Sequence, residues 1–305
     1  NVFWKEKGYC TKKEFSQFCG STVLLALLPK RYYTQNQNLD FSVEVADFSA
    51  APSSVFMVIC KILDDSGEIY VSSQVRILGS GYPELTDPVS VSFPLHDLRT
   101  PSKYILSLEL GGSSGKIHNS WNFWVYPADV GKLVTGTGID DSIHRIGDVC
   151  VTADINDAEQ LLSDGKKVFL TASPSCVKTD VATGFSSVFW NTAWTNLQAP
   201  HTLGIVCEHA HPVFKYFPTE NWSDWQWWEP LHGAASMILD SSGDIKPLIQ
   251  PIDTWFRSHR LALLFECRIA SGTLMVSSID FTNLNSHIVV CQLFYSIIKY
   301  MQSDD

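Results

Sequence analysis

The chain has 305 residues, of which 45% are hydrophobic and 18% charged, so it is long enough for two globular domains and its composition is not that of a disordered chain. Its formal net charge of −10 comes from 22 basic and 32 acidic residues, and the scattered basic residues argue against nucleic acid as a partner. No apolar run reaches the roughly 18 residues that a membrane span needs, and no signal-peptide core is visible.

Residues 1–34 predict a short helix and a lead-in segment. Thr11 followed by Glu14 matches a capping box, in which each side chain bonds the other residue's backbone N–H at the start of a helix. The chain opens within an element, so we expect it to be a fragment or a processed product.

Residues 35–127 predict a β-sandwich. Apolar and polar residues alternate over about seven short segments, and turn sequences such as Gly79-Ser80-Gly81 separate them. Alternation of this kind places apolar side chains on one face of each strand. The pattern is typical of an immunoglobulin-like architecture, without the paired cysteines of antibody domains.

Residues 128–305 predict an α/β domain. Strand-like runs alternate with helical patterns, and the last helix carries an apolar stripe from Val290 to Met301. This order indicates a mainly parallel, doubly wound sheet of flavodoxin-like type. The closely spaced strands between residues 261 and 279 predict an antiparallel hairpin added to that sheet.

Residues 203–229 concentrate the side chains that carry chemistry. An apolar run ending at Cys207 predicts a buried strand, and Glu208, His209 and His211 follow it. A cysteine beside histidines is a candidate nucleophile, as in class I glutamine amidotransferases. The strained turn that presents such a nucleophile needs glycine, which is missing on both sides of Cys207. We favour a buried structural thiol, and we expect all eight cysteines to be unpaired.

The same residues raise the possibility of a metal site. Glu208, His209 and His211 supply oxygen and nitrogen ligands of the kind that zinc accepts. Pro212 indicates a loop at this point, so nothing in the sequence fixes the ligands together, and we expect no metal and no cofactor. Polar side chains follow four predicted strands: Glu208 and His209, Asp253, Asp154, and Thr171 with Ser173. Ligands of open α/β sheets bind beyond such strand ends, so these side chains could converge on one crevice, with Asp253 as a ligand-binding residue.

Four tryptophans, Trp222, Trp225, Trp227 and Trp228, lie within seven residues. Indole faces stack on sugar rings, but tryptophan is also enriched in packed interfaces. We favour packing, with Trp227 and Trp228 buried and at least one of Trp222 and Trp225 more exposed. The alternative is a carbohydrate platform in which Trp222 and Trp225 bind the ligand.

Acidic residues lie among these tryptophans, at Glu220, Asp224 and Glu229. A pair of carboxyl groups flanking a sugar is enough for glycoside hydrolysis. Nothing in the spacing selects a pair, so the favoured interpretation is carboxylates solvated on a loop.

Several separate motifs together resemble the C-terminal region of bacterial, β-galactosidase-like proteins of glycoside hydrolase family 2. They are Lys7-Gly8-Tyr9, Glu14-Phe15, Phe18-Cys19, Pro29-Lys30-Arg31, the run from Asn119 to Pro127, Phe189-Trp190-Asn191-Thr192, His211-Pro212, Phe214, Phe217-Pro218-Thr219, Trp225-Gln226-Trp227-Trp228, Pro251-Ile252-Asp253 and Phe265-Glu266.

The resemblance implies an immunoglobulin-like sandwich followed by a class I glutamine amidotransferase-like domain without its nucleophile. It makes residues 1–34 the end of a missing catalytic region, because in family 2 the catalytic glutamates belong to a barrel of about 250 residues. No catalytic residue is therefore carried over to this chain, and whether the chain is an enzyme on its own stays open. The parent protein would be a glycosidase, periplasmic or extracellular.

The expected function is that of an accessory, non-catalytic portion in carbohydrate degradation, with a structural, oligomerisation or substrate-positioning role. Its expected partners are the catalytic barrel, an oligosaccharide or polysaccharide reached through the parent enzyme, and a second copy of the chain. One alternative is a carbohydrate-binding module that uses the cluster from Trp222 to Trp228. Another is an amidotransferase-like hydrolase that uses Cys207, with Glu208 and His209 as its other catalytic candidates.

Overall fold

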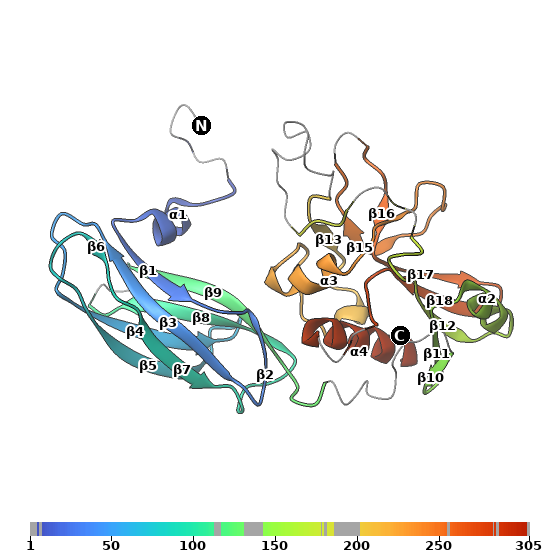
Figure 1. The fold of residues 1–305 in the computed structure, drawn as a ribbon, viewed down its shortest axis with the longest axis horizontal. Coiled ribbons are helices and arrows are strands. Elements are labelled where there is room, and N and C mark those ends of the chain that lie inside the picture. The colour runs from blue at the N-terminus through green and yellow to red at the C-terminus, as the bar shows by residue number, and fades with distance from the viewer. Residues whose placement is uncertain are drawn as a thin grey trace. The chain divides into compact units, whose positions relative to one another are not determined.

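The computed structural model describes residues 5, 8–112, 117–130, 143–177, 179, 182–185, 202–254, 257–282, 284 and 287–303. The chain divides into two compact units, Asn1–Pro127 and Ala128–Asp305 (Figure 1). No helix among the described residues is long and apolar enough to cross a membrane.

Unit 1 is a two-sheet β-sandwich preceded by helix α1 (Lys12–Cys19). One sheet contains β1 (Thr22–Leu27), β3 (Asn38–Asp47), β6 (Glu84–Leu85) and β7 (Val89–Pro94). The other has the order β2 (Tyr32–Thr34), β9 (His118–Tyr126), β8 (Ser102–Leu110), β4 (Val55–Leu63) and β5 (Ile69–Leu78).

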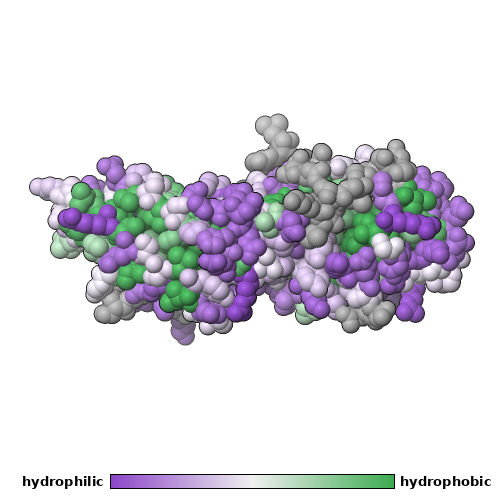
Figure 2. All heavy atoms as spheres, turned by 90° about the horizontal axis from the view of Figure 1, so that it is seen from below, coloured by the Kyte–Doolittle hydropathy of each residue, from purple (hydrophilic) through white to green (hydrophobic). Residues whose placement is uncertain are grey.

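The alternating pattern explains how this sandwich holds together. Leu39, Phe41 and Val43 on β3 are buried against Tyr104 and Leu106 on β8, while the residues between them face outward. Burying one face of each sheet in a shared core is the main source of stability in such a fold. On the outer surface, apolar residues are scattered among hydrophilic ones (Figure 2).

The segment 1–34 differs in part from the expected lead-in. The capping box is present, since Thr11 Oγ1 accepts from the Glu14 N–H and Glu14 accepts from the Thr11 N–H. Beyond this helix, however, β1 pairs along its whole length with β3, and β2 pairs with β9. The last third of the segment is therefore part of the sandwich itself.

Unit 2 contains a seven-stranded mixed sheet. Its order is β10 (His144–Ile146), β11 (Val149–Thr152), β12 (Lys167–Thr171), β18 (Gly272–Ser277), β17 (Leu264–Ile269), β15 (Pro247–Pro251) and β13 (Ile205–Cys207). A separate two-stranded sheet pairs β14 (Met237–Ile238) with β16 (Leu261–Ala262).

Helices cover both faces of the seven-stranded sheet. Helix α2 (Ile155–Ser163) packs on Val168 and Leu274, and Asp154 caps its first turn. Helix α4 (Ile288–Gln302) packs on the opposite face, where the Phe294 and Phe169 ring centroids are 5.7 Å apart. Val168 and Phe169 point to opposite faces because neighbouring residues alternate along a strand.

The direction of the strands corrects the expectation of a mainly parallel, doubly wound sheet. Only two neighbouring pairs, β11–β12 and β12–β18, are parallel, while β18, β17, β15 and β13 are antiparallel in succession. The antiparallel hairpin expected between residues 261 and 279 is present as β17 and β18. The molecule is thus a β-rich, multidomain protein whose second unit has a mixed sheet.

Candidate functional site

The tryptophan segment begins at the edge strand of the mixed sheet. Cys207 N–H donates to the Asn221 carbonyl, and Val206 and Trp222 form an antiparallel bridge, so the loop after β13 folds back along that strand. The segment then continues through two 3-10 turns, η1 (Pro212–Phe214) and η2 (Trp225–Trp227), and the short helix α3 (Trp228–His232).

One tryptophan anchors this segment. Trp227 is fully buried, its Nε1–H donates to Thr219 Oγ1 at 2.8 Å, and its ring centroid lies 5.2 Å from that of Phe217. The buried Gln226 beside it donates from Nε2 to the Pro218 carbonyl. Because these contacts fix the backbone at positions 226 and 227, they also fix the directions of the neighbouring side chains.

The other three tryptophans are exposed. Their exposed fractions are 54% for Trp222, 51% for Trp225 and 47% for Trp228, against 0% for Trp227. The prediction was correct for Trp222, Trp225 and Trp227 and wrong for Trp228. Successive residues in a helical turn point about 100° apart, so burying Trp227 directs Trp228 elsewhere.

Two of the exposed indoles form an aromatic cluster with Phe185. The Phe185 ring centroid lies 5.4 Å from that of Trp225 and 5.4 Å from that of Trp228, and the two indole centroids are 6.5 Å apart. His232 extends the row, since its ring lies 4.2 Å from Trp228 and its Nδ1 lies 2.6 Å from the Trp228 carbonyl. We call Phe185, Trp225 and Trp228 the aromatic cluster.

A buried carboxyl group supports the segment. Asp224 accepts from the backbone N–H groups of Gln226 and Glu220 and from Gln226 Nε2. Burial raises the pKa of Asp224 to about 7, although these hydrogen bonds favour the charged form. Asp224 is therefore not the solvated loop carboxylate that was expected.

Glu220 and Glu229 are the other two acidic residues near the tryptophans. Glu229 lies on α3, and its Oε1 is 3.7 Å from His287 Nδ1. The Glu220 backbone N–H donates to Asp224. Asp224 is directed into backbone donors rather than toward solvent, so it is not placed to reach a sugar.

Cys207 is placed as a structural thiol. It is buried, and burial raises its pKa far above the usual value, with further contributions from Asp224 and Glu208. A nucleophilic cysteine needs a lowered pKa and a base within reach. Glu208 and His209, the other catalytic candidates, are exposed beyond the strand end. The structure therefore disfavours the amidotransferase-like role of Cys207.

Glu208, His209 and His211, the candidate metal ligands in the sequence, differ in their surroundings. His211 Nε2 lies 3.3 Å from Glu266 Oε1, while Glu208 and His209 are exposed. Among the residues that the structure describes, no group of three histidine, cysteine, aspartate or glutamate side chains is arranged to hold a metal ion. The contacts of His211 with Glu266 and Tyr300 were not foreseen, because these residues lie far apart in the sequence.

The strand directions divide the candidate crevice residues between the two ends of the sheet. β11, β12 and β15 run the same way, so Asp154, Thr171 and Asp253 lie at one end. Asp253 follows β15, but β13 runs antiparallel to β15, so Glu208 and His209 lie at the opposite edge of the sheet. Asp253 is buried and accepts from the backbone N–H groups of Thr254 and His259. Its carboxylate shapes this loop.

Known proteins give limited comparisons. No curated protein matches the chain. A CARDB domain from Pyrococcus furiosus matches with a TM-score of 0.26 and 12% identity over 35% of this chain and 94% of that chain. A β-glucosidase from Listeria innocua matches with a TM-score of 0.25 and 10% identity over 34% of this chain and 16% of that chain. A β-glucuronidase from Bifidobacterium dentium matches with a TM-score of 0.23 and 10% identity over 48% of this chain and 26% of that chain. Structural similarities this weak give no information about the function of this chain.

Two family models match the chain. Residues 37–127 match a domain of unknown function (DUF8488), which falls within the sandwich. Residues 150–305 match a second domain of unknown function (DUF8487), which spans just over half of the 305 residues and includes the aromatic cluster and all of the mixed sheet except β10 and the first residue of β11. The chain therefore belongs to the DUF8487 family.

Proposed function

We propose that the chain is a non-catalytic accessory region that binds carbohydrate through Trp222 and the aromatic cluster of unit 2. The observation that carries the proposal is the exposure of three indoles within seven residues, each about half open to solvent, on a segment anchored by the buried Trp227. The resemblance to the C-terminal region of family 2 glycoside hydrolases supports the same class of ligand. The parent protein in this proposal is a glycosidase.

The chemistry of the cluster suits a sugar. The C–H faces of a pyranose ring pack against indole, while the hydroxyl groups at its edge need hydrogen-bond partners. His232 lies beside Trp228 and is exposed, so a polar group is available next to an apolar ring. A rigid platform also loses little conformational entropy on binding, since Trp227 and Gln226 already hold the backbone.

A non-catalytic role follows from the same geometry. Cys207 is buried with a raised pKa, and the Asp224 carboxyl is directed into backbone N–H groups. Neither group is placed to attack a ligand lying on the exposed indoles. We therefore expect the purified chain to hydrolyse neither aryl β-galactosides nor glutamine.

Calorimetric titration with galactose-containing oligosaccharides tests the proposal. The full chain should bind, and Trp225→Ala should lose about 5- to 150-fold in affinity, because stacking on one aromatic ring contributes about 1–3 kcal/mol in comparable stacked systems. The melting temperature of Trp225→Ala should stay close to that of the wild type. Tyr82→Ala, which removes an exposed aromatic side chain from unit 1, is the matched control and should bind normally.

Absence of binding by the wild type would reject the carbohydrate role. Light scattering on the same samples then distinguishes the remaining explanation, because a subunit interface would show as an oligomer that dissociates in Trp225→Ala. Turnover of glutamine that disappears in Cys207→Ala would reject the non-catalytic assignment.

A further inference from the structure

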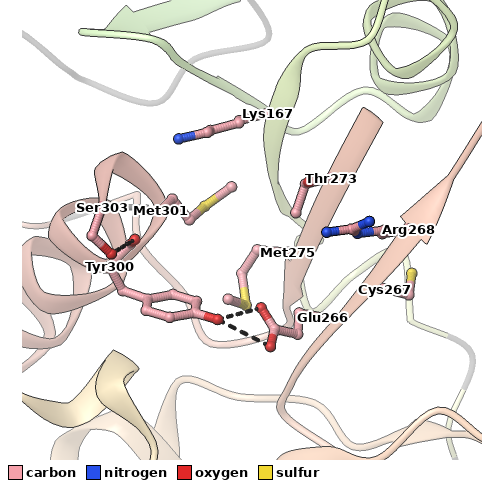
Figure 3. A pocket seen from close by; sticks show the side chains of 9 residues that line it. All are labelled: Lys167, Glu266, Cys267, Arg268, Thr273, Met275, Tyr300, Met301 and Ser303. Carbon is pink, nitrogen blue, oxygen red and sulfur yellow. Dashed lines mark hydrogen bonds between the residues drawn. The ribbon is translucent and has the colours of Figure 1, made fainter. Parts of the chain in front are cut away.

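A pocket of about 450 Å³ lies between the mixed sheet and the end of helix α4, away from the tryptophan segment in the sequence. Its walls come from β12, β17, β18 and the last turn of α4 (Figure 3). The volume is in the range of sites that hold small molecules. The proposed carbohydrate surface does not account for it.

Three polar residues on neighbouring strands lie in register and form a row across this pocket. Lys167 on β12 is the register partner of Thr273 on β18, and Thr273 is the partner of Arg268 on β17. Partners in register point to the same face, and strands are about 4.8 Å apart, so the two cationic residues start about 10 Å from each other. Figure 3 shows Thr273 between them.

The charges in this row are not equivalent. Lys167 Nζ lies 3.0 Å from Asp148 Oδ2, so part of its charge is already balanced. Arg268 is exposed, and within the described part of the chain no carboxylate pairs with it. A guanidinium with five N–H donors at the rim of a pocket is suited to bind a carboxylate or phosphate group.

Two residues before Arg268 on the same strand, Glu266 provides a hydrogen-bond acceptor that its neighbours hold in a fixed orientation. Glu266 is the register partner of Met275. Its carboxylate accepts a hydrogen bond from the Tyr300 hydroxyl, whose oxygen lies 2.9 Å from Glu266 Oε2 and 3.1 Å from Glu266 Oε1. His211 Nδ1 accepts from the Val213 N–H, which leaves His211 Nε2 to donate toward Glu266. These contacts hold the carboxylate in place and leave acceptor capacity for a ligand hydroxyl.

We propose that this pocket binds a small polyhydroxylated oxyanion, with Arg268 and Lys167 holding the anionic group beside Thr273 and Glu266 accepting hydrogen bonds from the hydroxyl groups. The shared chemistry is that of a sugar acid or a sugar phosphate. Met275 and Met301 line the pocket and offer an apolar surface to the carbon skeleton. The site is separate from the aromatic cluster, so either site can exist without the other.

Calorimetric titration of the full chain tests this with glucuronate, glucose 6-phosphate, glucose and inorganic phosphate as probes. At least one of the two sugar anions should bind saturably with a Kd below about 1 mM, and glucose should not bind this site. Arg268→Gln should weaken binding about tenfold or more, because it removes a charge-assisted hydrogen bond. The control Arg145→Gln changes an exposed arginine on β10 and should bind as the wild type does.

A second variant separates the two halves of the site. Glu266→Gln keeps the size of the side chain. It should weaken the binding of the sugar anion more than the binding of inorganic phosphate. Trp225→Ala should leave sugar-anion binding unchanged, so that failure of the carbohydrate proposal is recognised independently. Lack of saturable binding by both sugar anions up to about 10 mM overturns the inference. Equal binding by the wild type and Arg268→Gln, or equal effects of Glu266→Gln on both probe types, overturns it as well.

Discussion

Asp224 is the residue whose ionisation should affect stability most clearly. Burial raises its pKa to about 7 in the folded chain, above the ordinary value of 3.8. Its contribution to stability is therefore fully present below about pH 4 and is lost as the pH rises through 7. The upper limit of this loss is about 4 kcal/mol, since each pKa unit corresponds to about 1.4 kcal/mol.

Urea unfolding between pH 5 and pH 8 measures this effect. The wild type should lose stability as the pH rises, and Asp224→Asn should remove most of that dependence because an amide does not titrate there. Asp244→Asn, at an exposed carboxyl group, should keep the wild-type slope. Equal slopes in all three proteins would show that Asp224 is ionised throughout this range.

The four tryptophans should respond differently to truncation. Trp227 is fully buried and hydrogen-bonded to Thr219, so Trp227→Ala should cost about 3–5 kcal/mol by leaving a cavity. Trp228 is about half exposed, so Trp228→Ala should cost less than half as much. Chemical denaturation of both variants gives the comparison, and similar losses would mean that Trp228 packs more tightly than its exposure indicates.

At the scale of the element, the hairpin of β17 and β18 contains a close contact with helix α2. A Cβ atom added to Gly272 would lie 2.7 Å from the Lys166 carbonyl oxygen and 2.9 Å from the Leu162 Cα, both of them backbone atoms that cannot rotate away. Gly272→Ala should therefore lower the free energy of unfolding by about 1–3 kcal/mol. The loss should appear in thermal and urea unfolding alike.

Ala270, in the turn of the same hairpin, tests the reverse substitution, from alanine to glycine. Ala270 has a φ of 52°, in the left-handed region where a side chain is strained and glycine is not. Ala270→Gly should leave stability unchanged or raise it by up to about 1 kcal/mol. A loss as large as that of Gly272→Ala would show that the hairpin is sensitive to any change, and would remove the steric explanation.

These elements also show what the sequence can predict. Alternation of apolar residues depends only on neighbours along the chain, so the buried face of β3 and the hairpin at 261–279 follow directly from the pattern. Strand direction in the sheet depends on how distant segments meet. That is why the antiparallel path of β13, β15 and β17 was not foreseen, and why Glu208 lies at the opposite end of the sheet from Asp253, with which it was a candidate to share a crevice.

At the scale of the whole molecule, the candidate sites also could be predicted only where their residues are close together in the sequence. The exposed indoles could be located from the sequence because four tryptophans lie within one short segment, although which of them is buried depended on the turn of η2. The polar cluster of His211, Glu266 and Tyr300 has no local signal. It exists because an edge loop, a central strand and the last helix meet at one end of the sheet.

The buried thiols should report on the two units separately. All eight cysteines are free, and burial raises the pKa of Cys60 in unit 1 to about 12 and of Cys291 in unit 2 to about 11. Cys150 and Cys207 are also buried in unit 2, so these four thiols should be inert to alkylation in the native chain. In full denaturant all eight should react.

Alkylation at increasing denaturant, read by mass spectrometry, follows each unit through its own cysteines. Cys150, Cys207 and Cys291 lie on different elements of unit 2, so they should become reactive at one shared midpoint if that unit unfolds cooperatively. Cys60 has its own sandwich core and should follow the unfolding of unit 1. Trp227→Ala should lower the midpoint of the three unit 2 thiols, while Leu106→Ala, in the sandwich core, should lower that of Cys60. Separate midpoints for the three thiols of unit 2 would contradict a single cooperative unit and indicate that the mixed sheet opens in stages.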